Sequence, residues 1–159
     1  MPGKDFNLVL YQPVIPQNTG SIARLCACTG AALHLIHPLG FRTDDSSVKR
    51  AGLDYWPHVD ITEHSSWEAF VEKVRPERLV FLSKKAGKNF FDAELAPPVY
   101  LVLGSETTGL PEALWERHRE GFFKMPMRTE IVRSLNLSQT AAVAVYEAMR
   151  RSGWPLLPT

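Results

Sequence analysis

The amino-acid sequence predicts an α/β fold in which a mostly parallel sheet is flanked by helices. Short apolar segments alternate along the chain with segments whose apolar residues recur at helical spacing, which is the pattern of β–α units. Two of the apolar segments, residues 78–83 and 99–104, are continuous rather than alternating, as expected for strands buried on both faces. The chain has 159 residues and no internal repeat, so we expect one domain spanning residues 1–159.

The first elements are two strands with a helix between them. Residues 6–11 and 33–36 are short apolar runs that predict strands. The helix is expected to begin with Asn18 as its N-cap and to stop at Gly30, a residue that suits a helix C-terminus. Residues 44–52 then predict a short capped helix.

Capping signals mark the helices that follow. Ser65, with Glu68 three residues later, is a capping-box pattern that predicts the start of a helix over residues 65–74. Pro111 is expected at the first position of another helix, where a missing backbone N–H costs nothing. A last strand is expected over residues 121–126, and a long helix runs from about Asn136 to Arg151.

The last helix is apolar on more than one face. One stripe consists of Leu137, Ala141, Ala144, Val145, Ala148 and Met149, and further apolar surface comes from Ala142, Val143 and Tyr146. A helix of this kind needs more than one partner. We interpret it as packing on the core with one side and on another subunit with the other; a helix fully buried within a monomer is an equal alternative.

The formal net charge is only +1, so nucleic-acid binding would require basic residues that are concentrated locally. Four clusters offer this: Lys49–Arg50, Lys84–Lys85–Lys88, Arg128–Arg133 and Arg150–Arg151. For any one cluster taken alone, a solvated surface is the preferred interpretation. No apolar run is long enough to span a bilayer, and the N-terminus lacks a signal-peptide pattern, so a cytoplasmic location without membrane contact is expected.

Neither the cysteines nor the histidines form a metal-binding pattern. Cys26 and Cys28 lie two residues apart in an expected helix, where their side chains point to different faces, and we interpret both as small buried apolar residues. The five histidines show no ligand spacing, so no metal site is predicted.

Three segments carry polar residues that suit a site. In a parallel sheet, ligands bind beyond the carboxyl ends of the strands, which points to the loops after Leu82, Leu103 and Met125. A different segment, at the start of the first helix, holds Gly20, which permits close approach of another backbone, and Arg24 about one turn later. Taken alone, Arg24 is better interpreted as a surface residue of an amphipathic helix.

The second segment, residues 101–111, is a strand that runs into a glycine-containing loop. It has no lysine for phosphate, and Gly104 and Gly109 are five residues apart, so it matches neither a P-loop nor a dinucleotide fingerprint. Glu106 would repel a phosphate, which favours a ligand that is neutral or cationic at this point. A plain strand-to-helix turn, in which Glu106 only caps the next helix, is about equally compatible with the composition.

The third segment places Ser134, Asn136 and Ser138 alternately with leucines just before the last helix. Hydroxyls, an amide and free backbone N–H groups at a helix start can hold a polar ligand. The alternative is an ordinary N-cap, for which one of these residues is sufficient.

Together and in this order, the three segments resemble the SPOUT class of RNA methyltransferases over nearly the whole chain. The pattern N-x-G-x-x-x-R corresponds to Asn18, Gly20 and Arg24, the pattern G-x-E-x-x-G-L-P to residues 104–111, and the pattern S-x-N-L-S to residues 134–138.

Two further segments, residues 18–41 and 49–56, look especially like the short members of this class. Those members 2′-O-methylate the wobble nucleotide of certain tRNAs. The resemblance therefore implies S-adenosylmethionine as cofactor, tRNA as substrate, a homodimer with its sites at the interface, and a C-terminal trefoil knot.

Site residues are carried over motif by motif. The resemblance implies that the cofactor is bound by Leu82, Gly104, Met125, Ser134, Leu135 and Ser138. It implies supporting roles for Gly20, Glu106, Gly109 and Asn136. Catalysis is assigned to Arg24 together with Asn18. Because arginine is a poor general base, we expect Arg24 to orient the ribose hydroxyl and stabilise developing negative charge. The proton acceptor would then be either a substrate phosphate or Arg24 itself.

Some features leave alternatives open. Leu135 stands where methionine is often expected in this class, so another tRNA or rRNA site is a second candidate substrate. A non-catalytic RNA-binding module of the same fold is a rival, against which the intact motifs argue. A small nucleotide hydrolase is a third, weakened by the missing P-loop lysine.

Overall fold

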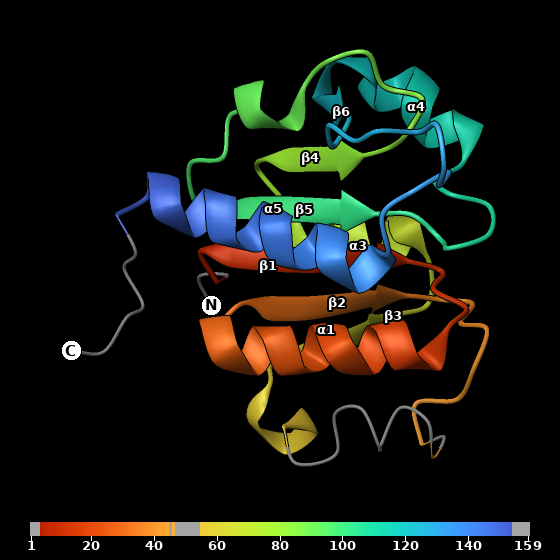
Figure 1. The fold of residues 1–159 in the computed structure, drawn as a ribbon. Helices are drawn as coiled ribbons and strands as arrows, with labels where there is room; N and C mark the ends of the chain where they lie inside the picture. The colour runs from red at the N-terminus through yellow and green to blue at the C-terminus, as the bar shows by residue number, and fades with distance from the viewer. Residues whose placement is uncertain (1–3, 45, 47–54, 154–159) are drawn as a thin grey trace.

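A six-stranded sheet, in the order β3-β2-β1-β5-β4-β6, forms the centre of the molecule, and every paired strand is parallel to its neighbour (Figure 1). The computed structural model describes residues 4–44, 46 and 55–153. The strands are β1 (Phe6–Tyr11), β2 (Ala32–Ile36), β3 (Ile61–His64), β4 (Leu79–Leu82), β5 (Val99–Leu103) and β6 (Phe122–Phe123). The predicted α/β class with a parallel sheet flanked by helices is confirmed.

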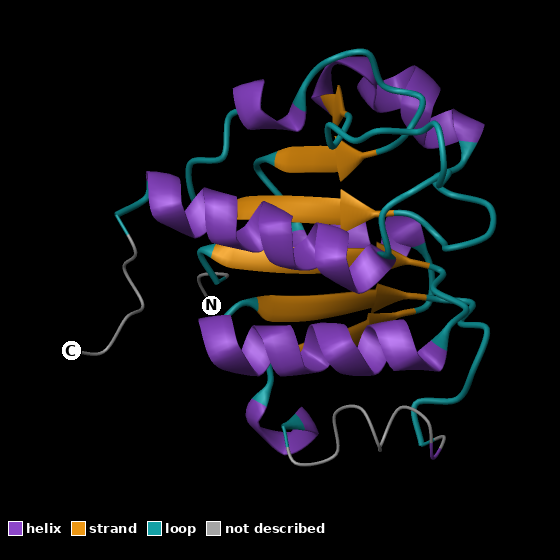
Figure 2. Cartoon of the chain, in the orientation of Figure 1, coloured by secondary structure: helices purple, strands orange, loops and turns teal. Residues whose placement is uncertain are grey.

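Helices cover both faces of this sheet (Figures 1 and 2). They are α1 (Pro16–Thr29), α3 (Trp67–Val74), α4 (Glu112–His118) and α5 (Leu137–Arg151), with 3-10 turns η1 (Trp56–His58), η2 (Phe90–Asp92) and η3 (Arg119–Gly121). On one face, α1 and α5 lie side by side and contact each other, and α5 also contacts β1 and β5. On the other face lie α3 and α4.

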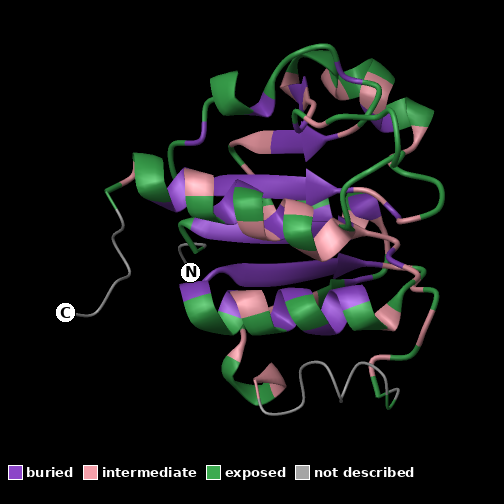
Figure 3. Ribbon diagram, viewed as in Figure 1, coloured by how far each residue is buried: buried purple, intermediate pink, exposed green. Residues whose placement is uncertain are grey.

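The apolar core is split by the sheet into two layers. Successive side chains of a strand point to opposite faces, so Leu8 and Leu10 pack with α1 and α5, whereas Val9 packs with Trp67 and Phe70 of α3. The central strands are therefore buried throughout, and the outer faces of the helices are exposed (Figure 3). Continuous apolar strands predicted this burial on both faces.

The strand register aligns the carboxyl ends of the central strands. Leu103 of β5 pairs with Leu10 of β1 on one side and with Leu82 of β4 on the other. The segments that leave these three strands therefore start at the same edge of the sheet. This is the edge at which ligands bind in parallel sheets.

The expected helix starts were partly wrong. The N-cap of α1 is Ile15, with Pro16 in the first turn, so Asn18 lies inside the helix and is not its N-cap. The N-cap of α3 is Ser66, whose hydroxyl accepts a hydrogen bond from the Ala69 backbone, so the capping box expected at Ser65 is not formed. Local patterns located both helices but missed the N-cap of α1 by three residues and that of α3 by one.

Other boundaries agree better with the sequence. Gly30 ends α1 in the left-handed conformation, with φ of 76°, which confirms the predicted stop. Pro111 is the N-cap of α4 rather than its first helical residue. The strand expected over residues 121–126 is only two residues long, and β3 was not predicted because three of its four side chains are polar. The helix expected over residues 44–52 falls almost wholly outside the described residues.

The cysteines and the last helix gave mixed outcomes. Cys26 is buried, as expected, but Cys28 is exposed, so that interpretation of Cys28 was wrong. The apolar stripe of α5 is packed in the core, whereas Val143 is 40% exposed and Tyr146 41% exposed. The alternative of a helix fully buried within a monomer is therefore wrong. No helix in the described part of the chain is long and apolar enough to cross a membrane.

Candidate active site

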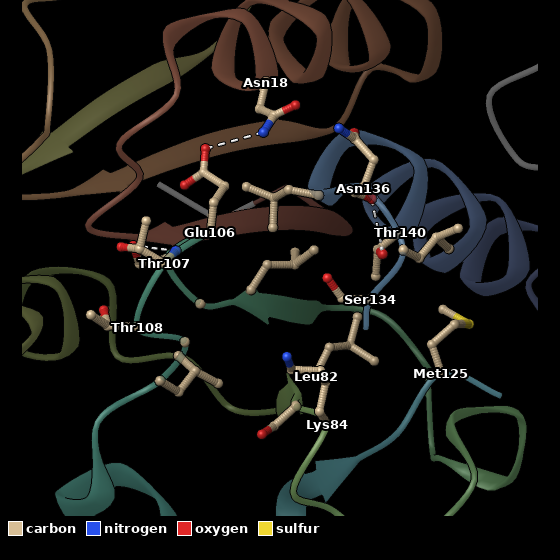
Figure 4. A pocket seen from close by; sticks show the side chains of 18 of the residues that line it. Asn18, Leu82, Lys84, Glu106, Thr107, Thr108, Met125, Ser134, Asn136 and Thr140 are labelled. Atoms are coloured by element: carbon tan, nitrogen blue, oxygen red, sulfur yellow. Dashed lines mark hydrogen bonds between the residues drawn. The ribbon is translucent and has the colours of Figure 1, made fainter. Parts of the chain in front are cut away.

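A cavity of about 410 Å³ opens at the carboxyl edge of the sheet, where three loops meet the start of α1 (Figure 4). The loops are residues 82–85 after β4, residues 103–110 after β5 and residues 124–137 between β6 and α5. Its size falls within the range of small-molecule sites. The apolar part of the lining consists of Ile15, Leu82, Leu103, Leu110, Met125, Met127, Leu135 and Leu137.

The loop after β5 is closed on itself by backbone hydrogen bonds. Ser105 N donates to Gly109 O (3.3 Å) and Gly109 N donates to Ser105 O (2.9 Å). This closure brings residues 109–110 so close to Gly104 that an added Cβ there would lie 2.5 Å from the Gly109 carbonyl carbon. Gly109 has a φ of 66°, which favours glycine. Both glycines are therefore required for the shape of this wall.

Glu106 connects this loop to the start of α1. Its carboxylate accepts hydrogen bonds from the backbone N–H groups of Val14 and Ile15, each at 2.9 Å, and from the Asn18 side-chain amide at 3.2 Å. The N–H groups at a helix start otherwise lack partners, and a negative charge there is favourable. Glu106 thus does not cap α4, the helix that follows it, which was one of the two expectations for this residue.

Asn136 organises the start of α5 as its N-cap. Its side-chain oxygen accepts from Ser138 N (2.9 Å) and from the Ser138 hydroxyl (2.6 Å), so that hydroxyl is engaged within the cap. The Thr140 hydroxyl donates to the Asn136 carbonyl at 3.1 Å. Ser134 and Leu135, which precede the cap, are exposed and line the cavity.

The structure brings most of the predicted site residues together. Those that line the cavity are Asn18, Leu82, Gly104, Glu106, Gly109, Met125, Ser134, Leu135 and Asn136. Three do not line it: Gly20 is buried within α1, Ser138 is held in the cap of α5, and Arg24 is exposed on α1. Asn18 and Asn136 are 118 residues apart in sequence, so the shared cavity is a result of the fold.

Arg24 lies over an aromatic ring outside the cavity. Its guanidinium carbon is 5.5 Å from the centre of the Tyr55 ring, within the range of a cation–π contact. Within the part of the chain that the structure describes, no carboxylate lies within 4 Å of Arg24. Arg24 is not among the residues that line this chain's own cavity.

The cavity also has basic groups that the motif comparison did not assign. Lys84, Lys85 and Lys124 line it, and the first two follow β4 directly. The sequence marked Lys84 and Lys85 as one of four basic clusters but could not show that they reach a site. Lys124 was not in any cluster, and its position directly after the last strand was the only signal.

A buried histidine pair lies on the other face of the sheet. His34 Nδ1 and His64 Nε2 are 2.9 Å apart, and both rings contact Phe70. Burial lowers the pKa of His34 to about 4, with smaller effects from His64 and Lys73, and burial also lowers the pKa of His64. No sequence pattern indicated this pair, because its two members are 30 residues apart. Among the described residues, no group of three or more His, Cys, Asp or Glu could hold a metal ion.

Comparisons with known proteins agree with this arrangement. The profile of the family described as the SpoU rRNA Methylase family matches residues 5–146. The chain is 46% identical over 154 residues to the "Putative tRNA (cytidine(34)-2'-O)-methyltransferase" of Listeria monocytogenes serotype 4b, covering 95% of this chain and 90% of that protein. It is 46% identical over 150 residues to the "tRNA (cytidine(34)-2'-O)-methyltransferase" of Saccharophagus degradans, covering 94% and 97%.

Solved structures share the whole fold. A putative RNA methyltransferase from Bacillus anthracis aligns with a TM-score of 0.89 and 48% identity, covering 97% of this chain and 98% of that one. A structure described as giving insights into the 2-OH methylation of C/U34 on tRNA aligns with a TM-score of 0.87 and 46% identity, covering 93% and 96%. The SpoU methyltransferase AviRb from Streptomyces viridochromogenes, in complex with AdoMet, shares the fold at 24% identity and a TM-score of 0.84, covering 96% and 62%.

Proposed function

The chain belongs to the SpoU methylase family, and we propose that it transfers a methyl group from S-adenosylmethionine to a ribose 2′-OH of tRNA, at the wobble cytidine or uridine of the anticodon. One observation carries this proposal. The three polar segments of the sequence meet around a single cavity at the carboxyl edge of the sheet, although they are far apart in the chain. The close relatives named for methylation of cytidine 34 support the choice of nucleotide.

The lining of the cavity fits an adenosine-type donor. The apolar walls suit a base and a ribose, and no lysine stands within the glycine-containing loop, where a phosphate-binding site would need one. Leu82, Gly104, Met125, Ser134 and Leu135 would hold this donor, which supplies an electrophilic methyl group when bound. The one carboxylate in the lining, Glu106, is directed to the start of α1 and would brace the wall rather than touch the donor.

The reaction would require an arginine that this chain's own cavity lacks. Arg24 is expected to hold the 2′-OH in line with the methyl group and to stabilise its developing negative charge. Because Arg24 lies outside the cavity, we propose a homodimer in which each subunit presents Arg24 to the cavity of the other. Asn18, on the same helix as Arg24, would hold that helix in place through its hydrogen bond to Glu106. The half-exposed outer side of α5, with Val143 and Tyr146, supports a subunit contact there.

We also propose that the C-terminal part of the chain is tied in a trefoil knot. Residues 124–136 run from β6 at the edge of the sheet back to its centre, and α5 then packs on β1, β5 and α1. A knot forms where the end of the chain threads through an earlier loop, and the cavity that Asn136 shares with residues 104–110 supports such a path. A tRNA substrate also makes the cytoplasm the expected location.

Incubation with labelled S-adenosylmethionine and total tRNA, followed by mapping of the labelled nucleotide, tests the proposed function. We expect label on the 2′-oxygen of the wobble cytidine or uridine. Label at another tRNA position would favour the second candidate substrate, as would label in rRNA in a parallel incubation with ribosomal RNA. Binding of tRNA with no transfer would favour a non-catalytic module instead.

A further inference from the structure

The basic clusters of the sequence differ in whether their charges are already paired. Arg150 and Arg151 both bind the Glu147 carboxylate, at 2.9 and 3.0 Å, and they hold the pKa of that carboxyl low, at about 2. Arg151 also donates to the backbone carbonyls of Phe91 and Ala93. This cluster fastens the end of α5 and has little charge left for a ligand.

Two other clusters offer no better surface near the cavity. Arg128 lies 3.5 Å from Glu130, and Arg133 is exposed but does not line the cavity. Lys49–Arg50 falls outside the described residues. This leaves the cluster that follows β4.

Within that cluster, the lysines closest to the cavity are the least engaged. Lys88 donates to the Glu120 carbonyl and lies 4.7 Å above the Phe123 ring. Lys85 is 3.4 Å from Glu112, but both side chains are more than half exposed, so the pair is weak. Of the described carboxylates, none lies within 4 Å of Lys84.

Lys124 brings a further positive charge to the same side of the cavity. Its backbone N–H donates to the Lys88 carbonyl at 2.7 Å, and its carbonyl accepts from Phe90 N at 2.9 Å. These bonds fix the backbone that carries its side chain. The cavity is lined by three lysines, Lys84, Lys85 and Lys124, which we call the lysine rim. In Figure 4, Lys84 lies across the cavity from Asn18.

We propose that the lysine rim binds the phosphate backbone of the RNA beside the nucleotide whose ribose enters the cavity. This inference rests on the proposed function. Three lysines in the lining of one cavity favour a polyanion, because binding releases the counterions condensed on the RNA. Phosphate contacts fix register and orientation but do not read bases, so the rim sets affinity and position and leaves the choice of nucleotide to other groups.

The test of the lysine rim is the affinity for a synthetic anticodon stem–loop RNA that contains a wobble cytidine. Fluorescence anisotropy measures this affinity at salt concentrations from about 50 to 200 mM. For the double variant Lys84→Gln/Lys124→Gln we expect about a tenfold loss of affinity at the low-salt end, and a slope of log Kd against log salt that is smaller by about 1 to 2. Binding of S-adenosylmethionine, measured by calorimetry, should be unchanged.

The matched control is Lys4→Gln/Lys73→Gln, which removes the same charge at exposed positions away from the cavity. It should keep the wild-type salt slope. A rim variant with wild-type affinity for the RNA and a wild-type salt slope would overturn the inference. A rim variant that loses affinity for S-adenosylmethionine instead would also overturn it, because the rim would then bind the carboxylate of the donor. If the wild-type protein methylates no RNA, the proposed function fails, and the anisotropy experiment still decides whether the rim binds phosphates.

Discussion

The two halves of the chain contribute to the site in different ways. The second half, from β4 to α5, supplies all three loops around the cavity. Among its described residues, the first half, from β1 to β3, adds only Ile15 and Asn18, and its Arg24 lies over Tyr55 outside the cavity. One half therefore forms most of a cavity within a single chain, whereas the other carries Arg24, the proposed catalytic residue, away from that cavity.

In the proposed function, this difference separates donor binding from catalysis. A pocket made by one chain can bind its ligand in any oligomeric state. Since Arg24 lies outside its own chain's cavity, the proposed reaction requires the approach of a second copy. Glu106 is the link between the halves, because it belongs to the loop after β5 and bonds to the start of α1.

The largest effect is expected for Arg24→Ala. Removing the group that orients the 2′-OH should lower the rate of methyl transfer by roughly 10³-fold or more, since this charge is needed only in the transition state. Affinity for S-adenosylmethionine, measured by calorimetry, should stay within about twofold of the wild-type value. Arg24 is proposed to act in the transition state, so its removal takes away no interaction that binds the donor in the ground state.

Arg119→Ala is the matched control, since Arg119 lies at the same 5.5 Å distance over the ring of Trp115, outside the cavity. Its rate should be that of the wild type. Retained turnover in Arg24→Ala would contradict the catalytic role.

The next effect tests the half that forms the pocket. Gly104→Val should weaken binding of S-adenosylmethionine by about ten- to a hundredfold, because its side chain would push residues 109–110 out of place. Gly87→Ala, where an added Cβ meets nothing within 4 Å, serves as control in isothermal calorimetry. Equal affinity of Gly104→Val and the wild type would remove the loop after β5 from the donor site.

Sequence patterns located the fold and the motifs but not their relation in space. Apolar periodicity placed the helices and most of the strands but missed β3, and it marked α5 as apolar on two sides. It could not show that Glu106 bonds to Val14, because the partners are 92 residues apart and one of them is a backbone N–H. It could not separate Lys84 from Arg150 either, since partners such as Glu147 decide which charges stay available.

The link between the halves can be tested with Glu106→Gln. An amide keeps the shape but can accept with only one of its two polar atoms, so one backbone N–H of Val14 or Ile15 loses its partner. We expect the free energy of unfolding in urea to fall by about 1–2 kcal/mol, and the rate of transfer to fall with it. Glu112→Gln, at an exposed pair with Lys85, should change stability by less than about 0.5 kcal/mol. Equal stability of Glu106→Gln and the wild type would show that the halves are not joined through this carboxylate.

The smallest effect on activity is expected at the buried histidine pair of the first half. The pKa of His34 is about 4 in the folded protein and near 6.5 when unfolded, so the unfolded chain binds more protons between these values. The contribution of neutral His34 to the free energy of unfolding is complete above about pH 6.5. As the pH falls toward 4, this contribution is lost, and the free energy of unfolding decreases by roughly 3 kcal/mol in total.

His34→Asn should flatten this dependence in urea unfolding between pH 7.5 and 4.5, because an amide can replace the contact at Nδ1 without titrating. His58→Asn, at an exposed position, should keep the wild-type profile. Methyl transfer at pH 7.5 should differ little among the three proteins. An unchanged pH profile in His34→Asn would show that the pair does not govern acid stability.

The most direct test of the division between the halves is complementation within a dimer. Arg24→Ala and Gly104→Val are co-expressed with different affinity tags, and the mixed dimer is purified over both. If Arg24 serves the cavity of the other subunit, one of the two sites is intact, and we predict about half of the wild-type rate per dimer from two variants that are each inactive or nearly so. A mixed dimer as inactive as Arg24→Ala alone would contradict the account, because Arg24 would then act within its own chain.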